Sequence, residues 1–235
     1  MAATHAARDS HPVHEELGGY EGSKLGMWLF LATELLLFGV MFALFALFHG
    51  KFALEFKLAH HSLDKMWGGL NTLVLITSSL TVALSLDAVQ RGLRKRANWL
   101  LIITIVLAGC FMVVKYIEYT GKFNAGIWIT DLQNIGGIIL PGDKSHSYVP
   151  IPTEWEGTPV RPEGISAFFA FYFLMTMVHG LHVVIGASIL LVILLKNMAG
   201  RYSHWYYTPV ENGALYWHLV DLIWIYLFPL FYLVS

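Results

Sequence analysis

The chain has 235 residues, of which 56% are hydrophobic and only 13% are charged, and its formal net charge is −1. A soluble domain carries about 25% charged residues, so this deficit indicates a protein surrounded by lipid. The near-neutral charge gives no support to a nucleic-acid partner. The single cysteine, Cys110, excludes an internal disulfide and a cysteine-rich metal site, and its apolar neighbours predict a buried side chain.

Residues 1–23 are polar and contain three histidines, so we expect an irregular, solvated N-terminal tail. The tail lacks the apolar run of a cleavable signal peptide. From residue 24 to 235 the pattern predicts one transmembrane domain, because a helix needs about 20 mostly apolar residues to span a bilayer. An open strand cannot satisfy its backbone hydrogen bonds in lipid, so the predicted fold is an all-α integral membrane bundle. Its five transmembrane helices are expected at residues 25–48, 68–89, 99–119, 166–195 and 213–234.

The links between these segments predict the orientation of the chain. The second and third segments are joined by a short basic link, which the positive-inside rule places on the cytoplasmic or matrix side. Five spans then place the N-terminus and the link near residues 196–201 on that side as well. The long link at residues 120–165 falls outside, and its five prolines exclude a continuous helix. The basic link contains Arg91, Arg94, Lys95 and Arg96.

Glu34 lies near the middle of the first segment, about nine residues or ~14 Å from its start at 1.5 Å per residue. A carboxylate at that depth is costly unless it is protonated or paired. Small residues form a stripe nearly opposite Glu34, and such stripes allow helices to pack closely. We therefore expect protein on both sides of this helix. Glu34 is either a neutral, hydrogen-bonded packing residue or a group that couples protons or conformations. The stripe consists of Ala32, Gly39, Ala43 and Ala46.

Three further pairs of ionisable residues are spaced three apart, so the members of each pair share a helix face. The spacing of Lys115 and Glu118 predicts an ion pair at the membrane interface. The other pairs, on the last two segments, could suggest a metal or haem, but no Glu-x-x-His repeat on a second helix accompanies them. We expect hydrogen bonds between histidines and carboxylates within the bundle, with no catalytic residue, metal ligand or cofactor-binding residue. These two pairs are His179 with His182 and His218 with Asp221.

Several strings together resemble the cytochrome c oxidase subunit III family, and they cover all five segments in order. Residues 24–34, ending in Ala32-Thr33-Glu34, resemble the helix that bears the intramembrane glutamate of that family. Residues 70–79 are similar to the next helix, and Glu118-Tyr119 to the end of the helix after it. His179-Gly180-Leu181-His182-Val183 is similar to the most recognisable string of the family, and residues 216–221, including His218 and Asp221, resemble its C-terminal helix.

The resemblance implies a non-redox accessory subunit of a haem-copper terminal oxidase in aerobic electron transport. The chain itself would hold no haem or copper, since those groups belong to partner subunits of the proton-translocating enzyme. Its implied partners are subunit I as the main contact, subunit II, other oxidase subunits and membrane phospholipids, with no nucleic acid. Its implied roles are stabilising subunit I during turnover, supporting proton uptake and binding lipid. Glu34, Glu118, His179, His182, His218 and Asp221 are the intramembrane candidates for proton coupling.

The sequence also departs from the family. Met177 and Val178 stand where many relatives have Gly-Phe, and the two N-terminal helices of seven-helix members have no counterpart. The lipid-filled cleft that those helices help to form would need a partner subunit here. A bacterial cytoplasmic membrane is favoured over the mitochondrial inner membrane. A quinol oxidase subunit III is an open alternative, as are an independent proton or solute transporter and a haem-bearing membrane enzyme.

Overall fold

The computed structural model describes residues 12–127, 137–141, 147–202 and 206–233, with side chains from residue 21 onward. The described residues are almost entirely helical, and five of the helices are long and apolar enough to cross a membrane. The all-α, five-span prediction is therefore confirmed. The helices are α1 (Pro12–Lys51), α2 (Ala53–His60), α3 (Lys65–Gln90), α4 (Arg94–Asn124), α5 (Pro162–Met198), α6 (Thr208–Phe228) and a π-helical end, η1 (Pro229–Leu233).

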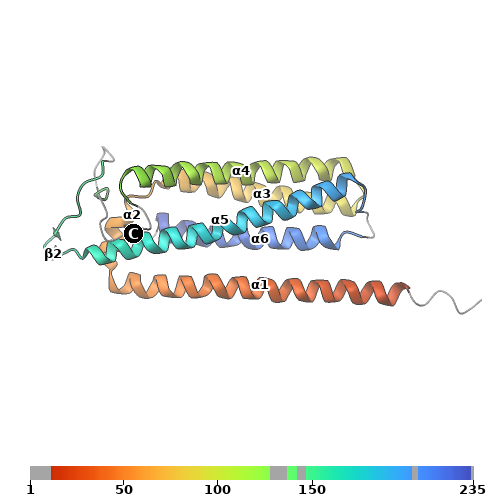
Figure 1. The fold of residues 1–235 in the computed structure, drawn as a ribbon, viewed down its shortest axis with the longest axis horizontal. Helices are drawn as coiled ribbons and strands as arrows, with labels where there is room; N and C mark the ends of the chain where they lie inside the picture. The colour runs from red at the N-terminus through yellow and green to blue at the C-terminus, as the bar shows by residue number, and fades with distance from the viewer. Residues whose placement is uncertain (1–11, 128–136, 142–146, 203–205, 234–235) are drawn as a thin grey trace, which may run out of the picture.

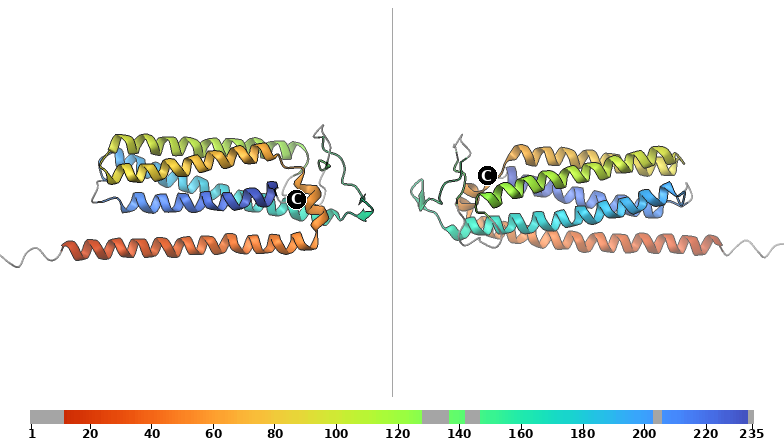
Figure 2. Two further views of the ribbon diagram at one scale, coloured as in Figure 1. Left: turned by 180° about the vertical axis from the view of Figure 1, so that it is seen from behind. Right: turned by 45° about the horizontal axis from the view of Figure 1, so that its top comes forward.

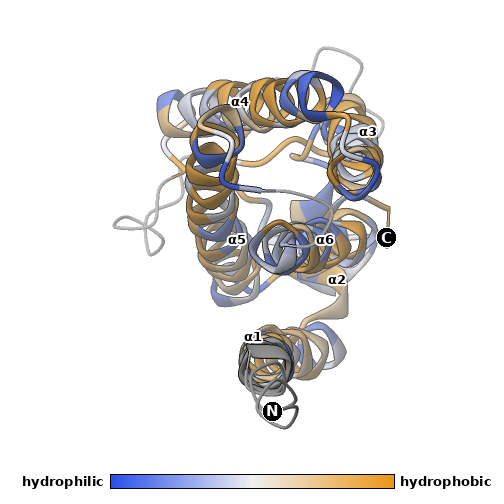
Figure 3. Ribbon diagram, turned by 90° about the vertical axis from the view of Figure 1, so that its right-hand side faces the viewer, coloured by the Kyte–Doolittle hydropathy of each residue, from blue (hydrophilic) through white to orange (hydrophobic). Residues whose placement is uncertain are grey.

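Four of the long helices form a square bundle, and the fifth lies outside it (Figure 3). Helices α3, α4, α5 and α6 each pack against two neighbours in the square, whereas α1 packs along α5 and α6. Large aromatic side chains fill the interior of the square, among them Phe111, Trp217 and Trp224. The bundle therefore has its own core, and α1 is added to one of its faces.

The two ends of the bundle differ (Figures 1 and 2). The start of α1, the α3–α4 link and the α5–α6 link lie at one end, as the orientation argument requires. Gly92, with φ of +72°, allows the tight α3–α4 turn because a left-handed backbone suits glycine. Helix α2, the strands and η1 lie at the opposite end. The shared end of the basic link and the N-terminal helix is confirmed, and the side of the membrane stays a prediction.

The structure corrects three details. The predicted irregular tail is helical from Pro12, because proline fits the first turn of a helix and α1 simply extends beyond the span. Residues 1–11, with His5 and His11, lie outside the described residues. Helix α2 was not predicted; its Phe56 packs against Phe45 and Phe168 and so holds α2 on the end of the bundle. Cys110, expected to be buried, is exposed on a surface that lipid would cover.

The link expected at residues 120–165 is shorter than predicted, since α4 continues to Asn124 and α5 begins at Pro162. Within its described parts, Ile138 pairs with Val149 in an isolated bridge. Strands β1 (Glu154–Trp155) and β2 (Thr158–Pro159) form a small antiparallel hairpin. The expected break in helix is therefore confirmed, and short β pairings order part of it.

Candidate functional site

Glu34 is placed by α1 against α5. The buried side chains of α1 follow one another at intervals of seven, three and four residues, so they form one narrow stripe on the helix. Glu34 lies within this stripe and faces protein, as expected. The small-residue stripe on the other side of α1 is exposed, so the described part of the chain covers only one of the two faces. The buried side chains of the stripe are Leu31, Phe38, Met41 and Phe45.

His182 on α5 is the partner of Glu34. The Glu34 Oε2 and His182 Nε2 atoms are 2.8 Å apart, and the side chains are only 16% and 12% exposed. The fully buried ring of Phe38 packs edge-on against the imidazole. A histidine–carboxylate hydrogen bond was the predicted form of polar contact, and this pair confirms it.

The second nitrogen of His182 fixes how this pair can hold protons. Nδ1 lies 2.7 Å from the carbonyl oxygen of Val178, which can only accept a hydrogen bond, so Nδ1 carries a proton. Nε2 then either accepts a proton from neutral Glu34 or donates one to its carboxylate. In both states a single proton lies between the two side chains, so neither is left as an isolated charge in the apolar surroundings.

His179, one turn before His182, has a different environment. It is fully buried in the square bundle, with its ring 5.6 Å from Phe111 and 5.3 Å from Trp224, measured between centroids. Neither ring nitrogen has a hydrogen-bond partner among the described residues. The two histidines were expected to share one helix face, but their rings have different neighbours. A three-residue step leaves about 60° between them, which is enough to turn one toward α1 and the other toward the core.

His218 and Asp221 on α6 face α3. His218 Nδ1 lies 2.6 Å from the hydroxyl of Ser79, and Asp221 also interacts with Ser79. Nearby, the indole of Trp217 donates to Ser78 at 3.1 Å. The contacts of His218 and Asp221 join α3 to α6 through the hydroxyl of one serine.

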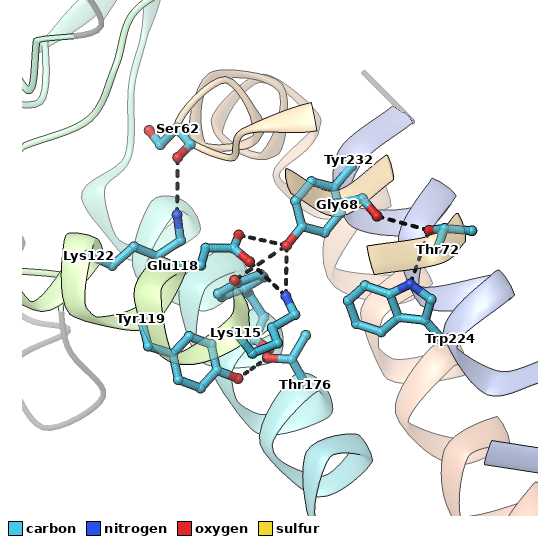
Figure 4. A network of polar contacts seen from close by, with 11 residues as sticks. Ser62, Gly68, Thr72, Lys115, Glu118, Tyr119, Lys122, Thr176, Trp224 and Tyr232 are labelled. Atoms are coloured by element: carbon cyan, nitrogen blue, oxygen red, sulfur yellow. Dashed lines mark hydrogen bonds and ion pairs between the residues drawn. The ribbon is translucent and has the colours of Figure 1, made fainter. Parts of the chain in front are cut away.

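Lys115 and Glu118 on α4 form the predicted ion pair, at 2.8 Å (Figure 4). The side chains are only 7% and 6% exposed, so the pair is buried within the protein, and its position at the membrane interface stays a prediction. The structure adds Tyr232 of η1, whose hydroxyl accepts from Lys115 at 2.9 Å and donates to Glu118 at 2.6 Å. The C-terminal end of the chain folds back onto α4 through this hydroxyl.

Lys122 is a charged residue that the sequence reasoning missed. It is 3% exposed and donates to the carbonyl oxygen of Ser62 at 3.1 Å. Its position could have been inferred, because Lys115, Glu118 and Lys122 are spaced by three and four residues and so share one helix face. The contact with Ser62 could not have been inferred, because it depends on tertiary packing across 60 positions.

The bonded candidate residues thus form three separate groups: one between α1 and α5, one between α3 and α6, and one on α4 and η1. His179 lies apart from them in the core of the bundle. Within the described part of the chain, no cluster of three or more histidine, cysteine or acidic side chains could hold a metal ion. The fold and the site together define a helical membrane protein with two buried pairs of ionisable groups, Glu34 with His182 and Lys115 with Glu118.

Comparison with known proteins agrees with this class. The family model of cytochrome c oxidase subunit III matches residues 9–133 and 163–235, interrupted only within the link that contains the hairpin. Cytochrome c oxidase subunit 3 of Papio hamadryas is 27% identical, covering 96% of this chain and 72% of the relative. The Marchantia polymorpha protein of the same name is 28% identical over 90% of this chain and 68% of the relative. The chain belongs to the cytochrome c oxidase subunit III family.

Proposed function

We propose that this chain is a non-redox accessory subunit of a cytochrome c oxidase, in contact with subunit I. The observation that carries the proposal is the position of α1, which holds a proton-sharing pair on one face and leaves its small-residue stripe open on the other. Relatives named cytochrome c oxidase subunit 3 favour this oxidase over the quinol oxidase alternative. In this role the chain supports proton uptake by subunit I and stabilises it during turnover.

The surface of α1 supports a protein neighbour on the stripe side. An added Cβ at Gly39 would meet nothing within 4 Å, and Ala43 and Ala46 beside it are exposed. Small side chains let a second helix approach closely and gain packing contacts that lipid tails do not supply. Subunit I is the proposed neighbour, with subunit II and other oxidase subunits in the same complex and phospholipid on the remaining apolar surface.

We also propose a bacterial cytoplasmic membrane, with the start of α1 and the link containing Arg91 and Arg94 on the cytoplasmic side. The concentration of positive charge in that short link supports the proposed side of the membrane. Haem and copper are assigned to partner subunits, and no redox step is assigned to residues of this chain.

The test is purification through an affinity tag on this chain, followed by an optical spectrum. We expect a stoichiometric haem-containing partner in mild detergent, and a colourless chain once the partner is dissociated. A Soret band that stays with the isolated chain would contradict the non-redox assignment. Proton or solute transport by the chain reconstituted alone in vesicles would favour the transporter alternative.

A further inference from the structure

A cavity of about 630 Å³ lies at the end of the bundle that carries α2. It is enclosed by the α2–α3 link, the last turns of α4, and Ile139 and Tyr148 of the following link. Glu118 and Lys122 form its buried side, and residues 64–66, which are exposed, form its mouth. The cavity therefore connects a buried pair of charges with the outside of the protein.

The two charges at the buried side are not equally neutralised. Glu118 accepts from both Lys115 and Tyr232, so its carboxylate has direct charged and neutral donors. Lys122 has three N–H donors, and the acceptor within hydrogen-bonding distance among the described residues is the uncharged carbonyl of Ser62. A buried ammonium without a directly bonded anion is costly, so this position favours an anion from outside.

The charges around the cavity leave an excess of one positive charge. Lys65 and Lys122 line the cavity together with Asp64 and Glu118; Lys115, which lies outside the lining, already pairs with Glu118, so the two lining lysines are left against Asp64 alone. Asp64 is exposed and already accepts the Met66 N–H at 2.8 Å, as the cap of α3. Burial, together with nearby basic side chains, lowers the pKa of His61 at the rim, so this imidazole adds no charge at neutral pH.

One border of the cavity is apolar. Met66 and Ile117 are 84% and 51% exposed. They lie next to the outer surfaces that α3 and α4 would present to lipid. Trp67 lies beside them at the start of a spanning helix, a level where headgroups meet hydrocarbon. An amphiphile could therefore place its charge in the cavity and its chains along the helices.

We propose that this cavity binds a phosphate-type oxyanion, held by Lys122 and Lys65. Two sources share this chemistry, a phospholipid headgroup and free phosphate. The apolar border favours the lipid. The site is independent of the accessory role proposed above, since it rests only on residues at the end of the bundle.

The test is native mass spectrometry of the full-length chain in detergent, with three probes: phosphatidylglycerol, diacylglycerol with the same acyl chains, and inorganic phosphate. Lys122→Gln removes the buried charge, and we expect about tenfold weaker binding, the size of one charge-assisted hydrogen bond. Gly121→Leu fills the cavity from the side of α4, where an added Cβ meets nothing within 4 Å, and it should block binding. Gly109→Leu, equally unobstructed on the same helix but outside this cavity, is the control.

Retention of phosphatidylglycerol but not diacylglycerol, with losses in Lys122→Gln and Gly121→Leu only, would support the site with a lipid as its source. Binding of inorganic phosphate that displaces the lipid would support the site with free phosphate as its source. Equal retention of both lipids, or binding unchanged by Gly121→Leu, would overturn the proposal. Because Gly121→Leu leaves every charge in place, it keeps the test decisive even if Lys122→Gln does not fold.

Discussion

Helix α1 and the bundle of α3, α4, α5 and α6 shield polar groups from lipid in different ways. The bundle buries its helices on several sides and encloses the Lys115–Glu118–Tyr232 group. Helix α1 buries a single stripe and places Glu34 at the edge of the bundle, where His182 meets it. The bundle therefore encloses its polar group, whereas α1 has a partly covered Glu34–His182 pair and, among the described residues, an exposed small-residue stripe.

Glycines show the same difference. In the bundle, an added Cβ at Gly186 would lie 2.9 Å from the Trp217 ring and 3.0 Å from the Tyr216 ring. On α1, an added Cβ at Gly39 would meet nothing within 4 Å. Gly186 is therefore required by the packing of the bundle itself, whereas Gly39 lies in the small-residue stripe where we propose that another chain approaches.

The largest effect is expected from breaking the buried ion pair. Glu118→Gln should lower the free energy of unfolding by about 3–5 kcal/mol, because Lys115 would stay buried without its counter-charge. Thermal unfolding of the purified chain in detergent measures this. Adding Lys115→Met to Glu118→Gln should recover much of the loss, since no unpaired charge then remains. If the single variant were as stable as the wild type, the pair would have no structural role.

A smaller effect is expected at the two glycines. Gly186→Leu should destabilise the free chain by about 1–3 kcal/mol through overpacking between α5 and α6. Gly39→Leu should leave the free chain within about 0.5 kcal/mol of the wild type, yet reduce the amount of subunit I that co-purifies. The same unfolding assay and the subunit ratio together distinguish the two outcomes. Unchanged association in Gly39→Leu would remove the stripe from the interface.

The smallest effect is expected at the α3–α6 contact. Ser79→Ala removes the hydroxyl that bonds His218, and hydrogen bonds between transmembrane helices contribute only about 0.6 kcal/mol on average. Thr77→Ala is the matched control, because that hydroxyl bonds only the carbonyl of Leu73 on its own helix. If Ser79→Ala lowered the free energy of unfolding as much as Glu118→Gln, the α3–α6 contact would contribute as much to stability as the buried ion pair.

The sequence predicted those features that follow from the lipid surroundings of the chain. Apolar runs of sufficient length determined the five spans, and the cost of a carboxylate in lipid predicted that Glu34 would find a partner. The sequence also predicted that at least one histidine of the last two spans would bond a carboxylate, but it could not say which histidine meets Glu34, because helix rotation decides which of them faces α1. His179 and His182 illustrate this, since their 60° separation sends them to different neighbours.

Features that depend on chain segments far apart could not be predicted. Tyr232 reaches Glu118 across 114 positions, and Arg161 reaches the buried carboxylate of Glu55 across 106. Neither contact leaves a periodic signal in the sequence. The start of α1 at Pro12 is different, since a proline followed by Glu15 and Glu16 is a recognisable helix start that the polar composition of the segment masked.

The central claim is that Glu34 and His182 support an oxidase without taking part in its electron transfer. The most direct test is oxygen consumption by the purified complex carrying Glu34→Gln, followed from the first turnover through many cycles. Glutamine keeps the shape of the side chain and one hydrogen bond to His182, but it cannot exchange a proton. We expect an intact haem spectrum, a normal content of this chain and an initial rate that falls moderately, with activity declining faster than in the wild type. Loss of the haem spectrum, or of all activity from the first turnover, would contradict the accessory role and assign Glu34 a direct part in catalysis.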